Sequence, residues 1–337
     1  MITDTPRGLF CEAGNFYIDP WQPVGRALIT HAHSDHARPG SDAYLCAAPG
    51  ATVLRHRLPE ARVETLQYGA TIAIGDVRVS FHPAGHIVGS AQVRLERAGE
   101  VWVVSGDYKR AADPTAAPFE PVRCHTFITE ATFALPIYTW DPPASVIDEI
   151  VTWWRLNRDA EQPSLLFCYV LGKAQRILAE LREHAWEPIR LHGAMAGVTD
   201  AYREAGIALA ATERIAEGTR GKALSRALVL APISARGTPW MRRVPNASTA
   251  FASGLMRVRG VRRQRAFDRG FVLSDHADWP SLLGTIEETG ASRVLVTHGW
   301  SDALARFLAE RGLETATLRT AFEGEAGELA PEPEPAA

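Results

Sequence analysis

The stretch His31-Ala-His-Ser-Asp-His36 follows the apolar run Ala27–Thr30 directly and holds three imidazoles and one carboxylate. Side chains alternate between two faces in extended backbone, so His31 and His33 point the same way and can share one metal ion. Asp35 and His36 fall in the following turn and can face a second ion. Nitrogen and carboxylate ligands suit zinc, manganese or iron better than magnesium or calcium. The alternative is a polar loop that happens to be rich in histidine, but such clusters normally bind metal.

Three later positions can complete the shells of two metal ions. His86 and Asp107 follow the apolar runs Val77–Phe81 and Val101–Ser105, and His298 follows Val294–Thr297. Polar groups at strand ends are where α/β proteins build their sites. Together with the first stretch, these positions give seven ligands for two metals.

Composition and length limit the class of protein. The chain has 337 residues, of which 46% are hydrophobic and 22% charged, so it is an ordinary globular chain of roughly two domains. Its four cysteines lie far apart and form no CxxC pair, which indicates a reduced, cytoplasmic location. The first residues lack the features of a secretory signal, and no apolar run is long enough to predict a membrane span.

The pattern of apolar runs changes along the chain. Short β-branched runs dominate the first 143 residues and predict a sheet-rich start. From Ala144, helical spacing over Ser145–Arg158 and later alternation of strands and helices predict a βα unit with a parallel sheet. The Pro-rich ending is expected to be disordered.

Charge is concentrated in one segment. Residues 236–270 hold nine arginines and one acid, a local charge of +8, whereas the whole chain carries −3. A basic patch on an acidic chain predicts a polyanionic partner. The alternative is an arginine-rich face that only contacts solvent.

Taken together, the candidate ligands resemble those of the metallo-β-lactamase fold hydrolases, and Asp19 resembles the carboxylate on that family's first strand. Glu130 and the segment Ser274–Trp279 are similar to motifs of the β-CASP branch, which processes nucleic acids, as is Gly172-Lys-Ala-Gln175. The short segments 106–110, 135–138 and 231–235 are similar to segments of the bacterial DNA ligase-associated exonucleases. The resemblance covers residues 9–325.

This resemblance implies an α/β architecture: a four-layer αββα metallo-β-lactamase fold with an inserted α/β β-CASP-like cassette. The metallo-β-lactamase domain would comprise residues 1–140 and 266–328. The cassette would span 141–265, and 329–337 would be a disordered tail.

The resemblance also implies roles for individual residues. One metal would be held by His31, His33, His86 and Asp107, and the other by Asp35, His36, Asp107 and His298. The expected catalytic residues are His276 as proton donor, Asp35, and Glu130, which would orient a ligand or His276, while Asp19 would support the ligands from behind. The expected substrate-binding residues are Lys173, Ser234, Arg236, Arg262 and Arg263.

The implied function is that of a di-metal phosphodiesterase, a DNA exonuclease acting in DNA repair. It would use two divalent transition metals, zinc before manganese or iron. Its partners would be single-stranded or end-containing DNA, an ATP-dependent DNA ligase and a helicase, with no membrane. The residue at position 298 favours an RNA substrate instead, because DNA-specific relatives have valine at the position of His298 and RNA-processing relatives have histidine. An RNA-processing nuclease is therefore one alternative, and a small-ester or thioester hydrolase, which shares the metal ligands, is the other.

Overall fold

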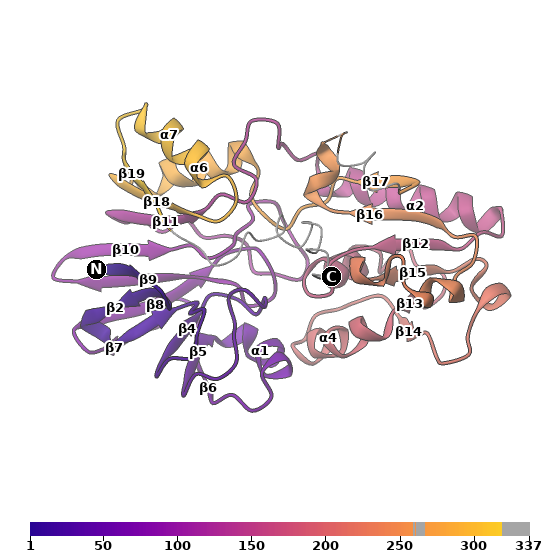
Figure 1. Ribbon diagram of the computed structural model, residues 1–337, viewed down its shortest axis with the longest axis horizontal. Coiled ribbons are helices and arrows are strands. Elements are labelled where there is room, and N and C mark those ends of the chain that lie inside the picture. The colour runs from indigo at the N-terminus through magenta and orange to yellow at the C-terminus, as the bar shows by residue number, and fades with distance from the viewer. Residues whose placement is uncertain (259, 261–266, 319–337) are drawn as a thin grey trace, which may run out of the picture.

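Two mixed sheets form one half of the computed structural model, which describes residues 1–258, 260 and 267–318 (Figure 1). The first sheet has the strand order β1 to β6. Its strands are β1 (Ile2–Thr5), β2 (Gly8–Cys11), β3 (Phe16–Ile18), β4 (Ala27–Ile29), β5 (Tyr44–Ala47) and β6 (Val63–Leu66). The second sheet has the order β19-β18-β11-β10-β9-β8-β7. Its strands are β7 (Thr71–Ile74), β8 (Val77–Pro83), β9 (Ala91–Arg97), β10 (Glu100–Val104), β11 (Thr126–Glu130), β18 (Arg293–Thr297) and β19 (Glu314–Thr317).

These two sheets face each other across a shared apolar core. Residues of both sheets, such as Phe16 and Leu28 from the first and Phe81 and Val93 from the second, belong to one buried cluster. The outer face of the first sheet packs with α1 (Ala51–Arg57), and that of the second with α6 (Trp279–Thr289) and α7 (Ser301–Ala309). We call this half the two-sheet lobe.

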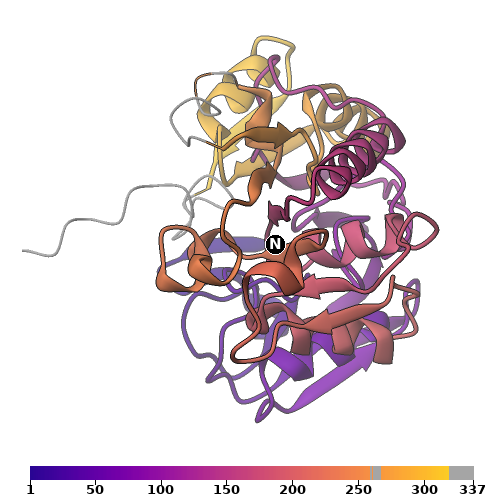
Figure 2. The same cartoon turned by 90° about the vertical axis from the view of Figure 1, so that its right-hand side faces the viewer.

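A third sheet, wholly parallel, forms the other half, which we call the third-sheet lobe (residues 143–271). In Figure 2 this lobe faces the viewer. Its strand order is β14-β13-β15-β12-β16-β17. The strands are β12 (Ser164–Phe167), β13 (Ile189–Leu191), β14 (Thr212–Arg214), β15 (Leu228–Ala231), β16 (Ser248–Ala252) and β17 (Arg269–Phe271). The helices are α2 (Pro143–Asp159), α3 (Lys173–Glu180) and α4 (Gly193–Glu204).

Local chemistry explains where the main helices begin and end. Pro143 opens α2 at a position where its missing N–H costs nothing. Asp278 caps α6 by accepting a hydrogen bond from the Ser281 N–H at 3.1 Å, and Gly290 ends that helix in a left-handed conformation. The predicted mixed α/β class, the parallel sheet after residue 144 and the helix at α2 are confirmed.

Some predicted boundaries differ from the structure. The predicted cassette ended at residue 265, but the third sheet takes in β17 at 269–271, so its last strand lies past that limit. The apolar run Phe271–Ser274 leaves the sheet after Phe271 and turns toward the other lobe. The predicted tail, 329–337, lies outside the described residues. Within the described part of the chain, none of the helices has both the length and the apolar character needed to cross a bilayer.

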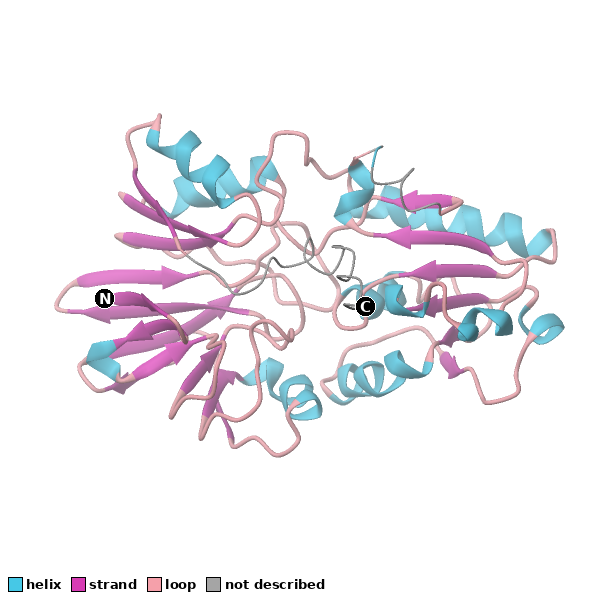
Figure 3. Cartoon of the chain, viewed as in Figure 1, coloured by secondary structure: helices cyan, strands magenta, loops and turns pink. Residues whose placement is uncertain are grey.

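Strand direction determines where the two lobes present their polar residues. β10, β11 and β18 run parallel, and β8 runs the same way because it is antiparallel to β9. Their carboxyl ends therefore share one edge of the second sheet. The loops of both lobes meet in the middle of the molecule (Figure 3).

Candidate metal centre

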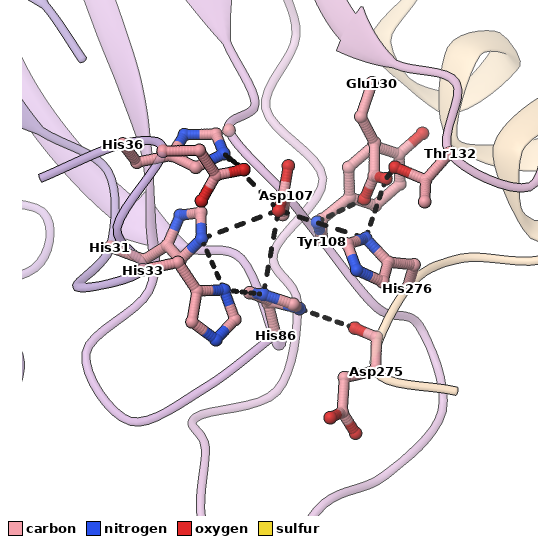
Figure 4. Close-up of polar contacts among 12 residues, drawn as sticks. His31, His33, His36, His86, Asp107, Tyr108, Glu130, Thr132, Asp275 and His276 are labelled. Carbon is pink, nitrogen blue, oxygen red and sulfur yellow. Dashed lines mark hydrogen bonds and ion pairs between the residues drawn. The ribbon is translucent and has the colours of Figure 1, made fainter. Parts of the chain in front are cut away.

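Loops that follow strands carry the candidate ligands. The segment His31–His36 follows β4, His86 follows β8, Asp107 follows β10, and His298 follows β18. Residues far apart in the sequence thus meet at one place (Figure 4). The structure brings together six of the seven predicted ligands in two groups that share Asp107.

The first group consists of His31, His33, His86 and Asp107. Their ligand atoms all lie within 4.8 Å of one another. His33 Nδ1 is 3.0 Å from His31 Nε2 and 3.1 Å from His86 Nε2. Asp107 Oδ2 is 3.5 Å from His31 Nε2 and 3.8 Å from His86 Nε2. Three nitrogens and one oxygen therefore face the same small volume.

Two of these rings have their outer nitrogens fixed by main-chain carbonyls. His33 Nε2 is 3.1 Å from the carbonyl oxygen of Leu171, and His86 Nδ1 is 2.7 Å from that of Asp275. A carbonyl can only accept, so each outer nitrogen carries the ring proton. Both inner nitrogens then present lone pairs. Fixing a ligand histidine through its other nitrogen is typical of metal sites.

Asp19 fixes two more rings from behind. Its carboxylate accepts hydrogen bonds from the Thr30 N–H at 2.8 Å, the Thr30 hydroxyl at 2.6 Å and His36 Nδ1 at 2.8 Å. Because the Thr30 hydroxyl donates to Asp19, it accepts from His31 Nδ1 at 3.1 Å. In their neutral forms, His31 and His36 therefore both offer Nε2 as a lone pair toward Asp107. Asp19 lies where the sequence prediction placed it, in contact with a ligand rather than among the ligands.

The nitrogen lone pairs that face one another in the first group can all coordinate one cation. The inner nitrogens of His31, His33 and His86 cannot hydrogen-bond to one another in these tautomers. Their separations of 3.0 and 3.1 Å come near the value of about 3.3 Å between two nitrogens of a tetrahedral zinc site. Desolvation by burial lowers the pKa of all three rings, which favours the neutral form that binds metal. The residues of this group therefore suit a divalent transition metal.

The second group consists of His36, Asp107 and His298. His36 Nε2 lies 3.5 Å from Asp107 Oδ2, the same oxygen that faces the first group, and the rings of His36 and His298 are 5.3 Å apart. His36 Nε2 is buried and has no hydrogen-bond partner among the described residues. The Asp35 carboxylate lies 3.6 Å from His36 Nε2, at the edge of the group rather than within it.

Charge and backbone geometry distinguish this second group. Burial disfavours the charged form of His36, but the carboxylates of Asp107, Asp35 and Asp19 outweigh it and hold the pKa of His36 well above its usual value. Burial likewise opposes ionisation of Asp107, yet the surrounding histidines hold its pKa well below the usual range. His298 adopts a left-handed conformation with φ of 60°, which is uncommon for residues other than glycine.

A buried histidine–carboxylate pair flanks both groups. His276 Nδ1 donates to Glu130 Oε2 at 2.8 Å, and Glu130 Oε1 accepts the Tyr108 N–H at 2.7 Å. The Thr132 hydroxyl also donates to Oε2. The ring of His276 lies 4.7 Å from that of His86. Glu130 therefore holds His276 in one orientation beside the ligands, and its role during catalysis stays a prediction.

The structure does not support the substrate-binding role expected for Lys173. Its side chain is fully buried, and its ammonium lies 2.9 Å from Asp275 Oδ2. A lysine at a helix start is typical of a phosphate site, but the sequence could not show that an internal carboxylate already lies there.

Of the other predicted substrate-binding residues, two are described and two lie outside the described chain. Ser234 and Arg236 are exposed in the loop after β15, and the Arg236 guanidinium lies 4.3 Å from the centre of the Phe267 ring. Arg262 and Arg263 fall outside the described residues, so their role stays a prediction.

Sequence reasoning missed Asp275. It lies in the motif around His276 but received no role, although its carbonyl contacts His86 and its carboxylate contacts three buried cations. One signal could have pointed to it. Lys109 and Lys173 are two of only three lysines in a chain that otherwise uses arginine, which suggests that both meet specific partners.

No protein-family model matches the chain. The chain is 35% identical over 315 residues to a probable DNA ligase from Opitutus terrae, an alignment that covers 91% of this chain and 30% of that protein. It is 32% identical over 134 residues to the endoribonuclease ysh1 of Emericella nidulans, covering 37% of this chain and 14% of that protein. It is 27% identical over 137 residues to the endoribonuclease YSH1 of Saccharomyces cerevisiae, covering 36% of this chain and 16% of that protein. The chain thus spans less than a third of each of these relatives.

One solved structure has a similar fold. A protein of unknown function from Enterococcus faecalis V583 superposes with a TM-score of 0.58 at 13% sequence identity, over 87% of this chain and 79% of that one. At this identity, the likeness concerns the fold alone.

Proposed function

We propose that this chain is a two-metal phosphodiesterase that degrades DNA from an end. The observation that carries the proposal is the pair of ligand groups joined by Asp107 Oδ2, with the His276–Glu130 pair beside them. We further propose that the two-sheet lobe has the metallo-β-lactamase fold and that the third-sheet lobe is an inserted β-CASP-like cassette. Its boundaries would be 141–271 rather than 141–265, because β17 belongs to its sheet.

Each part of the site has a task in this proposal. When bound, two divalent cations supply Lewis-acid stabilisation of the negative charge that develops on the phosphate oxygens. His276 gives a proton to the leaving oxygen of the nucleotide, and Glu130 keeps the ring oriented for that transfer. Asp107 belongs to both groups of ligands and so fixes the distance between them. Asp19 keeps the neutral rings of His31 and His36 in the tautomers that leave Nε2 free of a proton.

One comparison supports DNA as the substrate, and the place of His298 does not oppose it. The similarity to a probable DNA ligase extends over 91% of this chain, whereas the similarity to the endoribonucleases covers about a third of it. In addition, His298 lies in a ligand group, whereas discrimination between RNA and DNA requires groups that meet the 2′-hydroxyl. On the same grounds we propose a role in DNA repair in the cytoplasm, together with an ATP-dependent DNA ligase and a helicase.

The second candidate is an RNA-processing nuclease. The observation in its favour is that His298 lies in the second ligand group, because the RNA-processing branch has histidine at this position. The similarity to endoribonucleases supports the same reading.

A competition assay separates these candidates. Matched single strands of DNA and RNA, labelled at the 5′ or the 3′ end, are incubated with zinc- or manganese-loaded protein beside a circular single-stranded DNA. We expect faster turnover of DNA and no cutting of the circle. Faster turnover of RNA would support the second candidate, and efficient cutting of the circle would show an endonuclease. Loss of cleavage in His276→Ala with metal content retained would tie the activity to this site.

A further inference from the structure

A network of buried charges lies behind the histidine cluster. Its members are Lys109, Asp113, Lys173, Arg176 and Asp275, and each side chain is at most 5% exposed. Charged residues are rarely buried unless they are paired. The network joins the two lobes, because Lys173 and Arg176 belong to α3, whereas Lys109 follows β10.

Asp275 is the centre of this network. Lys173 Nζ lies 2.9 Å from its Oδ2, and Arg176 Nη1 lies 3.0 Å from its Oδ1. Lys109 Nζ is 3.6 Å from Oδ1. Burial opposes the ionised carboxylate, but these three cations outweigh it and hold the pKa of Asp275 well below the usual range. The carboxylate is therefore tightly held from several sides.

The main chain of the same segment contacts a candidate metal ligand. The carbonyl oxygen of Asp275 accepts a hydrogen bond from His86 Nδ1–H, with 2.7 Å between oxygen and nitrogen (Figure 4). Arg176 also donates to the carbonyl of Ser274 at 2.6 Å. Helix α3 thus holds this segment through both side chain and backbone, and the segment in turn sets the tautomer and the orientation of His86.

The start of α3 supports a second ligand directly. The carbonyl of Leu171 accepts from His33 Nε2 at 3.1 Å. Gly172 has a φ of 89°, and a Cβ there would lie 2.5 Å from Ile87 Cγ2, so only glycine fits. Gln175 accepts from the Gly172 N–H at 2.9 Å and donates to the carbonyl of Val170 at 3.1 Å, which fixes the turn. The Gly-Lys-Ala-Gln motif therefore has a structural reason at three of its four positions.

We propose that Lys173 and Arg176 are positioning residues for the metal centre, acting through Asp275 on His86. The proposal rests on the metal centre of the proposed function and goes beyond it, because it assigns the motif at α3 to metal retention rather than to phosphate binding. The third-sheet lobe then determines how tightly the first ligand group holds its ion. Replacing partners of this kind behind a ligand typically weakens metal affinity by about 10–100-fold.

The charge balance of the network shows which variant to make. Three cations face two carboxylates, so replacing Lys173 by methionine leaves two of each and no uncompensated buried charge. Replacing Asp275 would instead leave three cations facing one carboxylate, which endangers folding. Lys222→Met is the matched control, because it makes the same chemical change at an exposed position of the third-sheet lobe.

The test measures the zinc dissociation constant by competition with a chelating dye. We expect Lys173→Met to raise this constant about 10–100-fold and Lys222→Met to leave it unchanged. Arg176→Lys is the second variant, because it keeps the charge but loses the guanidinium nitrogen Nη1 that donates to both Ser274 and Asp275. Unchanged zinc binding in a folded Lys173→Met or Arg176→Lys protein would overturn the proposal.

A second readout needs neither metal nor substrate. In metal-free protein with labelled histidine, the Nδ1–H of His86 should give a distinct hydrogen-bonded proton NMR signal. We expect that signal in the wild type and in Lys222→Met, and its shift or loss in Lys173→Met. Its absence from the wild type would overturn the proposal. Wild-type protein that binds no zinc would refute the proposed function, while this signal would still test the positioning.

Discussion

The most informative single substitution is Glu130→Gln, because it changes the charge and donor pattern of one side chain with almost no change in shape. The Glu130 carboxylate accepts three hydrogen bonds: from the Tyr108 N–H, the Thr132 hydroxyl and His276 Nδ1. A glutamine amide has one accepting oxygen and one donating NH2 group. It therefore cannot satisfy all three donors.

Both orientations of the amide have a cost. If the oxygen faces His276, the NH2 group meets the Tyr108 N–H, and a buried donor loses its acceptor. If the NH2 group faces His276, the ring must move its proton from Nδ1 to Nε2. An unsatisfied buried group costs about 1–3 kcal/mol, so we expect the free energy of unfolding to fall by that amount. The catalytic rate constant on DNA should fall by roughly 10²–10⁴-fold, the usual contribution of a general acid.

Three measurements test this reasoning: single-turnover cleavage of end-labelled DNA, cleavage of a p-nitrophenyl phosphodiester, and metal content. The p-nitrophenyl ester should lose far less rate, because its leaving group needs no proton. Metal content should not change. Thr132→Val is the control, since it removes one donor to Glu130 but keeps the bond to His276. Loss of metal in Glu130→Gln would show that Glu130 is a ligand, and equal rate losses on both substrates would refute the acid role of His276.

Three further predictions concern the ligands and the residues around them. Asp107→Ala should empty both ligand groups, because Oδ2 lies 3.5 Å from His31 Nε2 and from His36 Nε2, and elemental analysis would find well under one metal per chain. Gly172→Ala should lower the free energy of unfolding by about 1–3 kcal/mol more than the matched Gly206→Ala in urea titrations. Both glycines have positive φ, but only at Gly172 would the new Cβ meet another side chain. Finally, although burial opposes ionisation, buried cations lower the pKa of Asp275 below its ordinary value of 3.8, so the stability that this carboxylate contributes is present above pH 3.8 and should be lost as the pH falls toward the lower folded-state pKa. Acid titration of unfolding should show a steeper loss there in the wild type than in Lys173→Met, which removes one of these cations, and equal slopes would contradict the assignment.

Six of the seven candidate ligands lie together in the structure, and the sequence located them because each lies in a loop that follows an apolar run; their role as metal ligands stays a prediction. A strand that ends in a histidine or carboxylate places that group at the edge of a sheet, whatever the rest of the fold. This was enough to bring His86, Asp107 and His298 to the same centre. The parallel third sheet was predictable for a similar reason, since strands that alternate with helices must return to the same edge.

The sequence was a poor guide wherever burial decided the outcome. Lys173 follows a strand and opens a helix, which is also how a phosphate-binding lysine looks in sequence. Only the fold shows that Asp275, about a hundred residues further on, occupies the space in front of its ammonium. The apolar character of the run Phe271–Ser274 likewise does not reveal that the chain leaves the sheet after Phe271. Asp35 lies at the edge of its group because a turn, unlike a strand, does not fix side-chain direction by spacing.

The two lobes contribute different parts of the candidate metal centre. The described ligands of both groups come from the two-sheet lobe, but the outer nitrogen of His33 is held by the carbonyl of Leu171, from the third-sheet lobe. The outer nitrogen of His86 is hydrogen-bonded to the carbonyl of Asp275, and the carboxylate of Asp275 contacts Lys173 and Arg176 of α3. The tautomers of His33 and His86 therefore depend on these contacts between the lobes, whereas that of His31 is set within the two-sheet lobe by Thr30. Metal binding and lobe contact must then stabilise each other, because whatever favours one favours the other by the same free energy. A site in a single lobe would lack this coupling.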